Sequence, residues 1–159
     1  MSLRNRVIDA LLCGFNPQWR NLMPSHVEHM NAVMDAFNDG DTSRFVELLE
    51  GATYSEPATG RSASGADLKA LMDGYRAAFP DQEGTVSTAV EGSDVVAGEV
   101  RFTGTHSGPM RLADGREVAP TGNTVEQVGV MVGHYENGTL ARLTYYFDAL
   151  SLWRQIGVV

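Results

Sequence analysis

The residues best suited to chemistry lie in the second half of the chain, where alternating apolar residues predict β-strands. Asp148 ends the last of these segments, and His106 ends an earlier one between two glycines. An aspartate enclosed by apolar groups has a raised pKa, which suits it to take a proton from a carbon next to a carbonyl. A histidine can polarise that carbonyl or carry the proton. We therefore predict Asp148 and His106 as catalytic residues.

Each of these two residues also has a purely structural interpretation. Asp148 directly precedes a predicted helix, and aspartate is a common N-cap residue. On the residues alone, the cap and the acid–base role are about equally supported. His106 is equally well explained as a loop histidine that bonds to the backbone. Both pairs of alternatives stay open at this point.

The last hairpin decides which side chains would surround Asp148. Asn137 and Gly138 predict a type I′ turn between strands at 124–135 and 139–148. An unbroken register places four polar side chains on one face, which we predict to line a substrate cavity: Gln127, Thr144, Tyr146 and Asp148. The opposite, apolar face would then contact a partner subunit.

Three residues outside this hairpin are weaker candidates. Tyr54 lies at the end of a short strand at 52–56, and we predict that it contacts the substrate. His26 lies on the apolar side of a helix and is a second predicted contact, although a histidine in that place more often belongs to the core. Glu56 follows near the expected mouth of the cavity, and two alternatives stay open for it: it is exposed there, or it lies in the pocket like Asp148.

Helices in the first half of the chain and strands in the second must position these residues. Ser25 and Glu28 form a capping box that begins one helix, and Ser64 and Asp67 form a second that begins another. Segments with a period of two follow at 85–90, 95–106, 124–135 and 139–148, and a short helix ends the chain. This order predicts an α+β fold in which helices cover one face of a curved antiparallel sheet. In such a fold we expect a pocket between the helical layer and the sheet.

Composition excludes several classes of function. The 159 residues suit one domain, and 12 Lys and Arg against 20 Asp and Glu give a formal net charge of −8. This balance argues against binding to nucleic acid or to an anionic membrane. Cys13 is the only cysteine, which excludes an intramolecular disulfide and favours the reducing cytoplasm. His26 and His29 match no zinc motif, so we predict no metal site.

The first 23 residues form a separate prediction. Arg4 and Arg6 precede an apolar run at 7–12 that Asp9 interrupts, and no small-residue cleavage site follows. The run predicts a short amphipathic helix. No apolar stretch reaches the roughly 18 residues of a membrane span. We therefore expect an N-terminal helical extension at 1–23 and one domain at 24–159.

Short motifs follow one another along the chain: FNDGD at 37–41, EP at 56–57, AAFPD at 77–81, GTHSG at 104–108, PTG at 120–122, YENGTL at 135–140, YFD at 146–148 and LWRQIG at 152–157. This ordered series, over about 24–157, resembles the SnoaL-like polyketide cyclase (ester cyclase) family. The resemblance implies the cone-shaped α+β fold of nuclear transport factor 2. It also implies a homodimer formed through the sheet, a small-molecule substrate, and no metal or organic cofactor.

The resemblance also implies a reaction. The family's cyclases close a ring of an aromatic polyketide ester by intramolecular aldol condensation, and an aspartate that corresponds to Asp148 serves as general acid and base. This chain departs from the family at Ser55, where a histidine is common, and at Thr144, where a tryptophan is common. These departures suggest a different substrate.

Two hypotheses of function follow. The first is a cofactor-independent enzyme that performs an aldol cyclisation or an isomerisation on a small apolar carbonyl compound. The second is a non-catalytic dimeric module that binds a small molecule in the same cavity. Fold alone does not choose between them, because related folds support several reactions.

Overall fold

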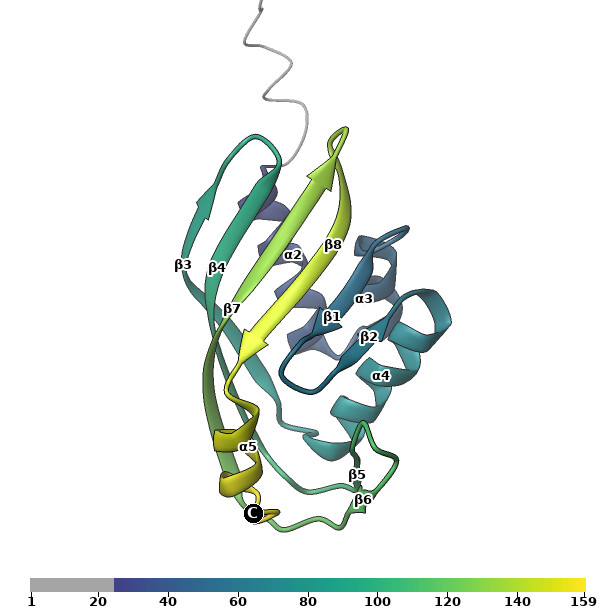
Figure 1. Ribbon diagram of the computed structural model, residues 1–159, viewed down its shortest axis with the longest axis vertical. Helices are drawn as coiled ribbons and strands as arrows, with labels where there is room; N and C mark the ends of the chain where they lie inside the picture. The colour runs from purple at the N-terminus through teal and green to yellow at the C-terminus, as the bar shows by residue number, and fades with distance from the viewer. Residues whose placement is uncertain (1–24) are drawn as a thin grey trace, which may run out of the picture.

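The structure, a computed structural model, describes residues 25–159, so the predicted N-terminal extension lies outside the described residues. Within this range, helices α2 (His26–Asp39), α3 (Thr42–Leu48) and α4 (Gly65–Ala78) precede the long strands, and α5 (Ala149–Gln155) follows the last strand. Figure 1 shows the first three of these helices gathered on one side of a curved sheet. The predicted α+β fold with helices on one face of a sheet is confirmed.

The main sheet has six strands in the order β2-β1-β8-β7-β4-β3. They are β1 (Thr53–Glu56), β2 (Arg61–Ala63), β3 (Glu83–Glu91), β4 (Val95–Thr105), β7 (Thr124–Glu136) and β8 (Thr139–Phe147). Two further strands, β5 (Met110–Arg111) and β6 (Glu117–Val118), form a separate hairpin. This hairpin lies beyond the end of α4, at the bottom of Figure 1.

One junction of the main sheet corrects the prediction of a wholly antiparallel sheet. β1 and β8 run parallel, with Ser55 opposite Thr144. β1 enters the sheet from the helical half of the chain and is not joined to β8 by a hairpin. No tight turn therefore forces the two strands to run in opposite directions. As a result, the ends of β1 and β8 lie side by side at the same edge of the helical layer.

The last hairpin has the predicted turn but not the predicted register. Asn137 and Gly138 both have positive φ, 51° and 80°, as a type I′ turn requires. The register then shifts between Tyr135 and His134, which leaves Ala141 as an extra residue in β8. Beyond this bulge, Met131 pairs with Tyr145 and not with Thr144.

The bulge exchanges the two faces of β8 for everything that follows it. A slip of one residue turns each side chain to the opposite side of a strand. Tyr145 and Phe147 therefore point toward the helices, and Tyr146 points away from them. The prediction that Tyr146 and Thr144 share a face with Gln127 is wrong for this reason.

Of the two capping boxes that the sequence predicts, one is present in the structure. The Ser25 hydroxyl accepts from the Glu28 amide at 3.1 Å, and the Glu28 carboxylate accepts from the Ser25 amide at 2.7 Å. The predicted capping box of α2 is thus confirmed. Ser64 makes no side-chain bond to α4, so the second predicted box is wrong. Gly65 has a left-handed backbone there (φ 52°), which departs from the geometry that a capping box needs.

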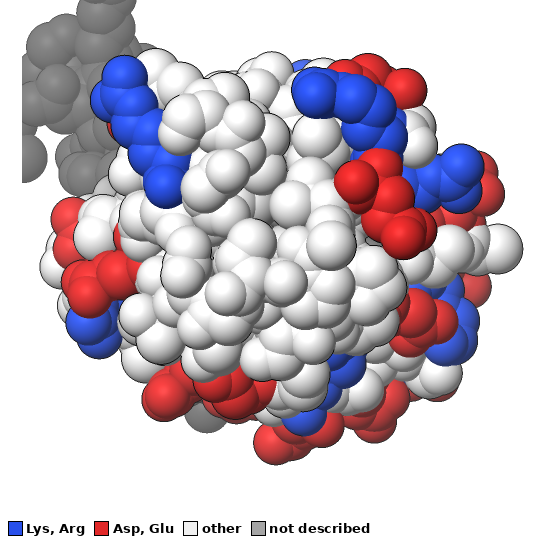
Figure 2. Space-filling model, turned by 90° about the horizontal axis from the view of Figure 1, so that it is seen from below, with Lys and Arg blue, Asp and Glu red and all other residues white. Residues whose placement is uncertain are grey.

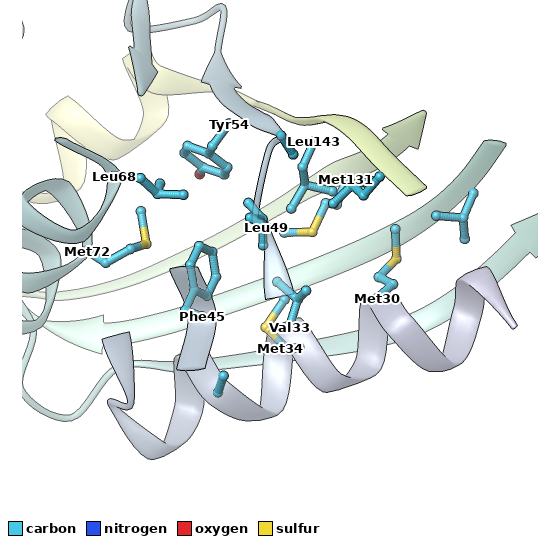
Figure 3. Close-up of a cluster of buried hydrophobic side chains, with 14 of the residues drawn as sticks. Met30, Val33, Met34, Phe45, Leu49, Tyr54, Leu68, Met72, Met131 and Leu143 are labelled. Carbon is cyan, nitrogen blue, oxygen red and sulfur yellow. The ribbon is translucent and has the colours of Figure 1, made fainter. Parts of the chain in front are cut away.

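The main core lies between α2, α3, α4 and the inner face of the sheet (Figure 3). The side chains labelled in the figure are Met30, Val33, Met34, Phe45, Leu49, Tyr54, Leu68, Met72, Met131 and Leu143. Each is at most 6% exposed, and burial of an apolar side chain of this size contributes roughly 1.5–3 kcal/mol. The core holds the helices against the sheet and so defines one end of a cavity.

Two strand glycines allow α2 to approach the sheet closely. A Cβ added at Gly98 would lie 2.6 Å from the Met30 sulfur, and one added at Gly84 would overlap the Met34 side chain. Glycine in a strand often marks such a close approach. The absence of two side chains therefore sets the depth at which the helix packs.

Candidate functional site

A cavity lies between the helices and the inner face of the sheet. Its volume is about 80 Å³, measured as the space open to the centre of a water molecule. Aromatic side chains form much of the wall, among them Phe37, Phe45, Phe79, Phe102, Phe147 and Trp153. Four methionines also line it: Met34, Met72, Met110 and Met131. The wall is therefore apolar and, through its methionines, adaptable in shape.

One acidic side chain lies in this apolar wall. Glu56 is 2% exposed and is the only buried carboxylate among residues 25–159. Its Oε1 accepts from the Tyr54 hydroxyl at 2.8 Å, and its Oε2 accepts from the Thr59 hydroxyl at 3.0 Å. The Tyr75 hydroxyl lies 2.8 Å from Oε1 and 2.7 Å from Oε2. Every side-chain partner of this carboxylate is thus a hydroxyl group that can donate to it.

Local structure explains why these groups meet. Tyr54 and Glu56 are two residues apart on β1, so both point to the same face of the sheet. Tyr75 comes from the side of α4 that faces the sheet. A turn that contains Gly60 (φ 73°) then returns the chain and places Arg61 opposite Glu56 in the antiparallel pair β1–β2.

Arg61 extends this group of side chains. Its Nη1 donates to the Tyr75 hydroxyl oxygen at 2.5 Å, and its guanidinium carbon lies 5.2 Å from the centre of the Tyr75 ring. Because the Tyr75 oxygen accepts from Arg61, its single proton is directed at Glu56. The other terminal nitrogen of Arg61, Nη2, donates to the backbone carbonyl of Arg111 in the β5–β6 hairpin.

Tyr145 supplies a polar atom without a partner. Glu56 and Tyr145 each directly follow the paired residues Ser55 and Thr144, so they are neighbours on adjacent parallel strands. The Tyr145 ring stacks on the Phe147 ring, with the two ring centroids 4.9 Å apart. The Tyr145 hydroxyl is buried and has no hydrogen-bond partner within residues 25–159. It is therefore free to bond to a molecule in the cavity.

The three tyrosines remain protonated near neutral pH. Burial and the nearby Glu56 carboxylate raise the pKa of Tyr54 and of Tyr75 well above the ordinary value, with Arg61 opposing the shift at Tyr75. The same two causes raise the pKa of Tyr145 to about 12. All three hydroxyls are thus donors, and none is a base.

Asp148 lies elsewhere, which corrects its predicted placement in a cavity. It is exposed and caps α5, where its Oδ1 accepts from the Ser151 amide at 3.0 Å. It is absent from the residues that line the cavity. β8 ends at Phe147, and the turn into α5 directs the carboxylate to the helix N-terminus. The cap, one of the two interpretations left open by the sequence, is the one that the geometry supports.

The side chains predicted to surround Asp148 are not brought together. Gln127 is buried and donates to the Asp148 backbone carbonyl at 2.8 Å. Thr144 is buried, with its hydroxyl 3.0 Å from that of Ser55. Tyr146 is 51% exposed. None of these three lines the cavity.

The predicted histidines lie outside the cavity wall as well. His106 is fully buried, with Nδ1 3.1 Å from the Thr121 hydroxyl and its ring 5.4 Å from that of Phe79. Burial lowers its pKa, so the ring is neutral near pH 7. His26 stacks on Tyr135 at 3.7 Å, which agrees with the alternative of a packing role. Tyr54 does line the cavity.

Sequence reasoning missed most of this site. Glu56 was a weaker candidate near the mouth of the cavity, and Arg61 and Tyr145 were not among the predicted site residues. The spacing of Tyr54 and Glu56, two residues apart before a turn, was an available signal because it puts both on one face. Tyr75 was hidden in a helical stripe that otherwise consists of core residues.

The end of the molecule that carries α5 and the β5–β6 hairpin has a distinctive surface. Figure 2 shows this end from below, with charged side chains around the rim and a broad uncharged area in the middle.

Within residues 25–159 no group of three or more His, Cys, Asp or Glu side chains could hold a metal ion. In the same part of the chain, no helix combines the length and hydrophobicity of a membrane span.

This fold, a cone of helices on a curved sheet with a cavity between them, is the nuclear transport factor 2-like or ketosteroid isomerase-like fold. Residues 27–156 match the family described as SnoaL-like polyketide cyclase. The chain belongs to this family, as the motif resemblance predicted.

Solved structures show the same fold at low sequence identity. AclR from Streptomyces galilaeus, provisionally described as a hydroxylase, has a TM-score of 0.67 and 23% identity, with 82% of this chain and 94% of AclR covered. IdmH from Streptomyces antibioticus, provisionally described as a polyketide cyclase, has a TM-score of 0.67 and 24% identity, with 84% of this chain and 99% of IdmH covered. A Catenulispora acidiphila protein with a ketosteroid isomerase-like fold, in complex with trimethylamine, has a TM-score of 0.66 and 15% identity, with 82% of this chain and 92% of that protein covered. No curated protein matches the chain.

Proposed function

We propose that this protein catalyses a cofactor-independent acid–base reaction on a small apolar carbonyl compound, either an isomerisation or an aldol-type ring closure. The observation that carries the proposal is a buried carboxylate, Glu56, beside the unpartnered hydroxyl of Tyr145 in an apolar cavity. A base next to a donor for the carbonyl oxygen is what enolate formation requires. Membership of the cyclase family supports the same class of chemistry.

In the proposed first step, Glu56 takes a proton from the carbon next to the carbonyl. The electron pair of the broken C–H bond forms the enolate, and its negative charge moves to oxygen. The Tyr145 hydroxyl donates to that oxygen. A carboxylate has about four acceptor positions, and three hydroxyl protons occupy three of those on Glu56. One position is therefore left to take the proton.

The second step returns the proton and completes either reaction. In an isomerisation the substrate also carries a C=C bond conjugated with the enolate, and Glu56 delivers the proton to the far carbon of that conjugated system, so that the double bond moves. In an aldol closure, the enolate carbon attacks a second carbonyl of the same molecule, and Glu56 protonates the new alkoxide. No redox partner is needed in either case. The cavity falls below the roughly 300 Å³ typical for drug-sized ligands, which favours a small substrate.

The test is hydrogen–deuterium exchange at the carbon next to a ketone, which reports the first step whatever the natural product is. Cyclohexanone and 1-indanone are incubated with the protein in D₂O and followed by NMR. We expect the wild-type protein to accelerate exchange, and Glu56→Gln to reduce the acceleration by about 100-fold or more. Asp148→Asn serves as the matched control and should retain it.

Two other outcomes would change the conclusion. Exchange that survives in Glu56→Gln and disappears in Asp148→Asn would overturn the role of Glu56 and restore the aspartate predicted from the sequence. A ketone that binds to the wild-type protein without any exchange would favour the alternative of a non-catalytic binding module.

We also propose that two copies pair through the outer face of the sheet. Val128, Val130 and Tyr146 support this, since they are 56%, 41% and 51% exposed on neighbouring strands β7 and β8. Large apolar side chains grouped on a surface often mark an interface. Sedimentation of Val130→Lys tests the pairing: we expect a dimer for the wild type and a monomer for the variant. A monomeric wild type would overturn it.

A further inference from the structure

A single side chain connects the buried carboxylate to the hairpin that forms part of the cavity wall. Arg61 donates through Nη1 to Tyr75, which contacts Glu56, and through Nη2 to the Arg111 carbonyl of the β5–β6 hairpin. We propose that Arg61 is a positioning residue that makes the geometry at Glu56 depend on closure of this hairpin. The part of this proposal that concerns catalysis rests on the proposed function above.

The hairpin is weakly supported without this link. β5 and β6 have two residues each and pair only with one another, outside the main sheet. A two-stranded hairpin of this size is at best marginally stable by itself. Met110 is 3% exposed and lines the cavity, whereas most of the residues from Arg111 to Glu117 are exposed. The buried Met110, the partly buried Leu112 and the Arg61 bond therefore hold the hairpin against the body.

The same arginine controls the proton of Tyr75. The Tyr75 oxygen accepts from Arg61, and it lies within 2.8 Å of both carboxylate oxygens of Glu56, to which it donates its proton. A guanidinium is a planar fork that can bond two acceptors at fixed angles, so movement of one acceptor disturbs the bond to the other. Opening of the hairpin withdraws the Arg111 carbonyl and Met110 together. This motion both admits a ligand and loosens the Tyr75 contact to Glu56.

The first test measures the hairpin without any substrate. Backbone hydrogen exchange is followed in the full chain, in particular at Leu112, whose amide donates to the Arg116 carbonyl at 2.8 Å across the hairpin. Loss of a charged hydrogen bond should raise the opening rate, so we expect exchange in Arg61→Met to be about tenfold faster. Arg76→Met is the control, because Arg76 also donates to a backbone carbonyl, that of Asn38, in a different element.

A second pair of variants separates coupling from simple tethering. Tyr54 and Tyr75 both donate to Glu56, but only Tyr75 contacts Arg61. We therefore expect Tyr75→Phe to accelerate hairpin exchange and Tyr54→Phe to leave it unchanged. Acceleration in Arg61→Met without any in Tyr75→Phe would mean that Arg61 only tethers the hairpin, and would overturn the coupling.

Folding is checked in the same experiment by the amides of β4 and β7. If Arg61→Met loses their protection, Arg61→Lys replaces it, because lysine keeps the charge but lacks the fork. Unchanged hairpin exchange in Arg61→Lys would then overturn the proposal.

Ketone exchange supplies the readout for positioning. We expect Arg61→Met to lower kcat about tenfold with little change in KM, since the carboxylate remains but is poorly held. A fall in kcat/KM caused by KM alone would overturn the positioning role. A wild-type protein with no ketone exchange would overturn the proposed function, whereas the link between hairpin and site would still be decided by the amide measurements.

Discussion

Glu56 and Asp148 are two carboxylates at the ends of neighbouring parallel strands, yet their surroundings differ completely. Glu56 turns inward, is 2% exposed and is held by three hydroxyls and, through Tyr75, by an arginine. Asp148 lies one residue beyond β8, is exposed and bonds to the first turn of a helix. The difference teaches that the burial and the donors around a carboxylate, more than its place in a sequence motif, decide what it can do.

The strongest test of this contrast removes the donor beside Glu56. We expect Tyr145→Phe to lower the rate of ketone exchange by about 100-fold, because it deletes the hydroxyl that stabilises the enolate oxygen. Stability in urea should hold, since that hydroxyl has no hydrogen-bond partner in the described part of the chain. Tyr146→Phe, the next residue on the exposed face, is the matched control. Equal rates in the two variants would contradict the assignment of Tyr145.

A second prediction concerns acid stability and His106. Because burial lowers the pKa of His106, the unfolded chain takes up this proton more readily than the folded protein. Its contribution to stability is therefore present above the ordinary histidine value of about 6.5 and is lost as the pH falls. Urea unfolding between about pH 5 and about pH 8 should show this loss. His106→Gln should flatten the profile.

The smallest expected effect lies at Asp148. Asp148→Ala removes the N-cap of α5 and should lower the free energy of unfolding by about 1 kcal/mol, with ketone exchange unchanged. Asp148→Asn should keep most of the stability, because asparagine also caps helices well. A large loss of exchange in Asp148→Ala at full stability would reverse the comparison between the two carboxylates.

Much of the fold could be predicted from local signals. The Ser25 cap, the Asn137–Gly138 turn and the long strands depend on residues that are close in sequence, and all three appear in the structure. The family followed from an ordered series of motifs. Errors arose where distant segments meet, as in the parallel pairing of β1 with β8.

The candidate site was harder to predict, because one extra residue changed it. The bulge at Ala141 carries no marked turn residue, yet it reverses the faces of Thr144, Tyr145 and Tyr146. The predicted cluster around Asp148 depended on an unbroken register. For Glu56 the sequence left an exposed position and a position in the pocket open, because nothing near it in the sequence reveals the α4 tyrosine that covers it.

The sequence by itself therefore determined the helices and the long strands, their order and the family, since capping, turn geometry and periodicity act over a few residues; the short strands β2, β5 and β6 were not predicted. Only the tertiary structure decided which carboxylate is buried. That choice depends on strand register and on the packing of α4 and the β5–β6 hairpin against the edge of the sheet. These are long-range contacts, and their effect on a charge comes from the solvent that they exclude and the donors that they bring near.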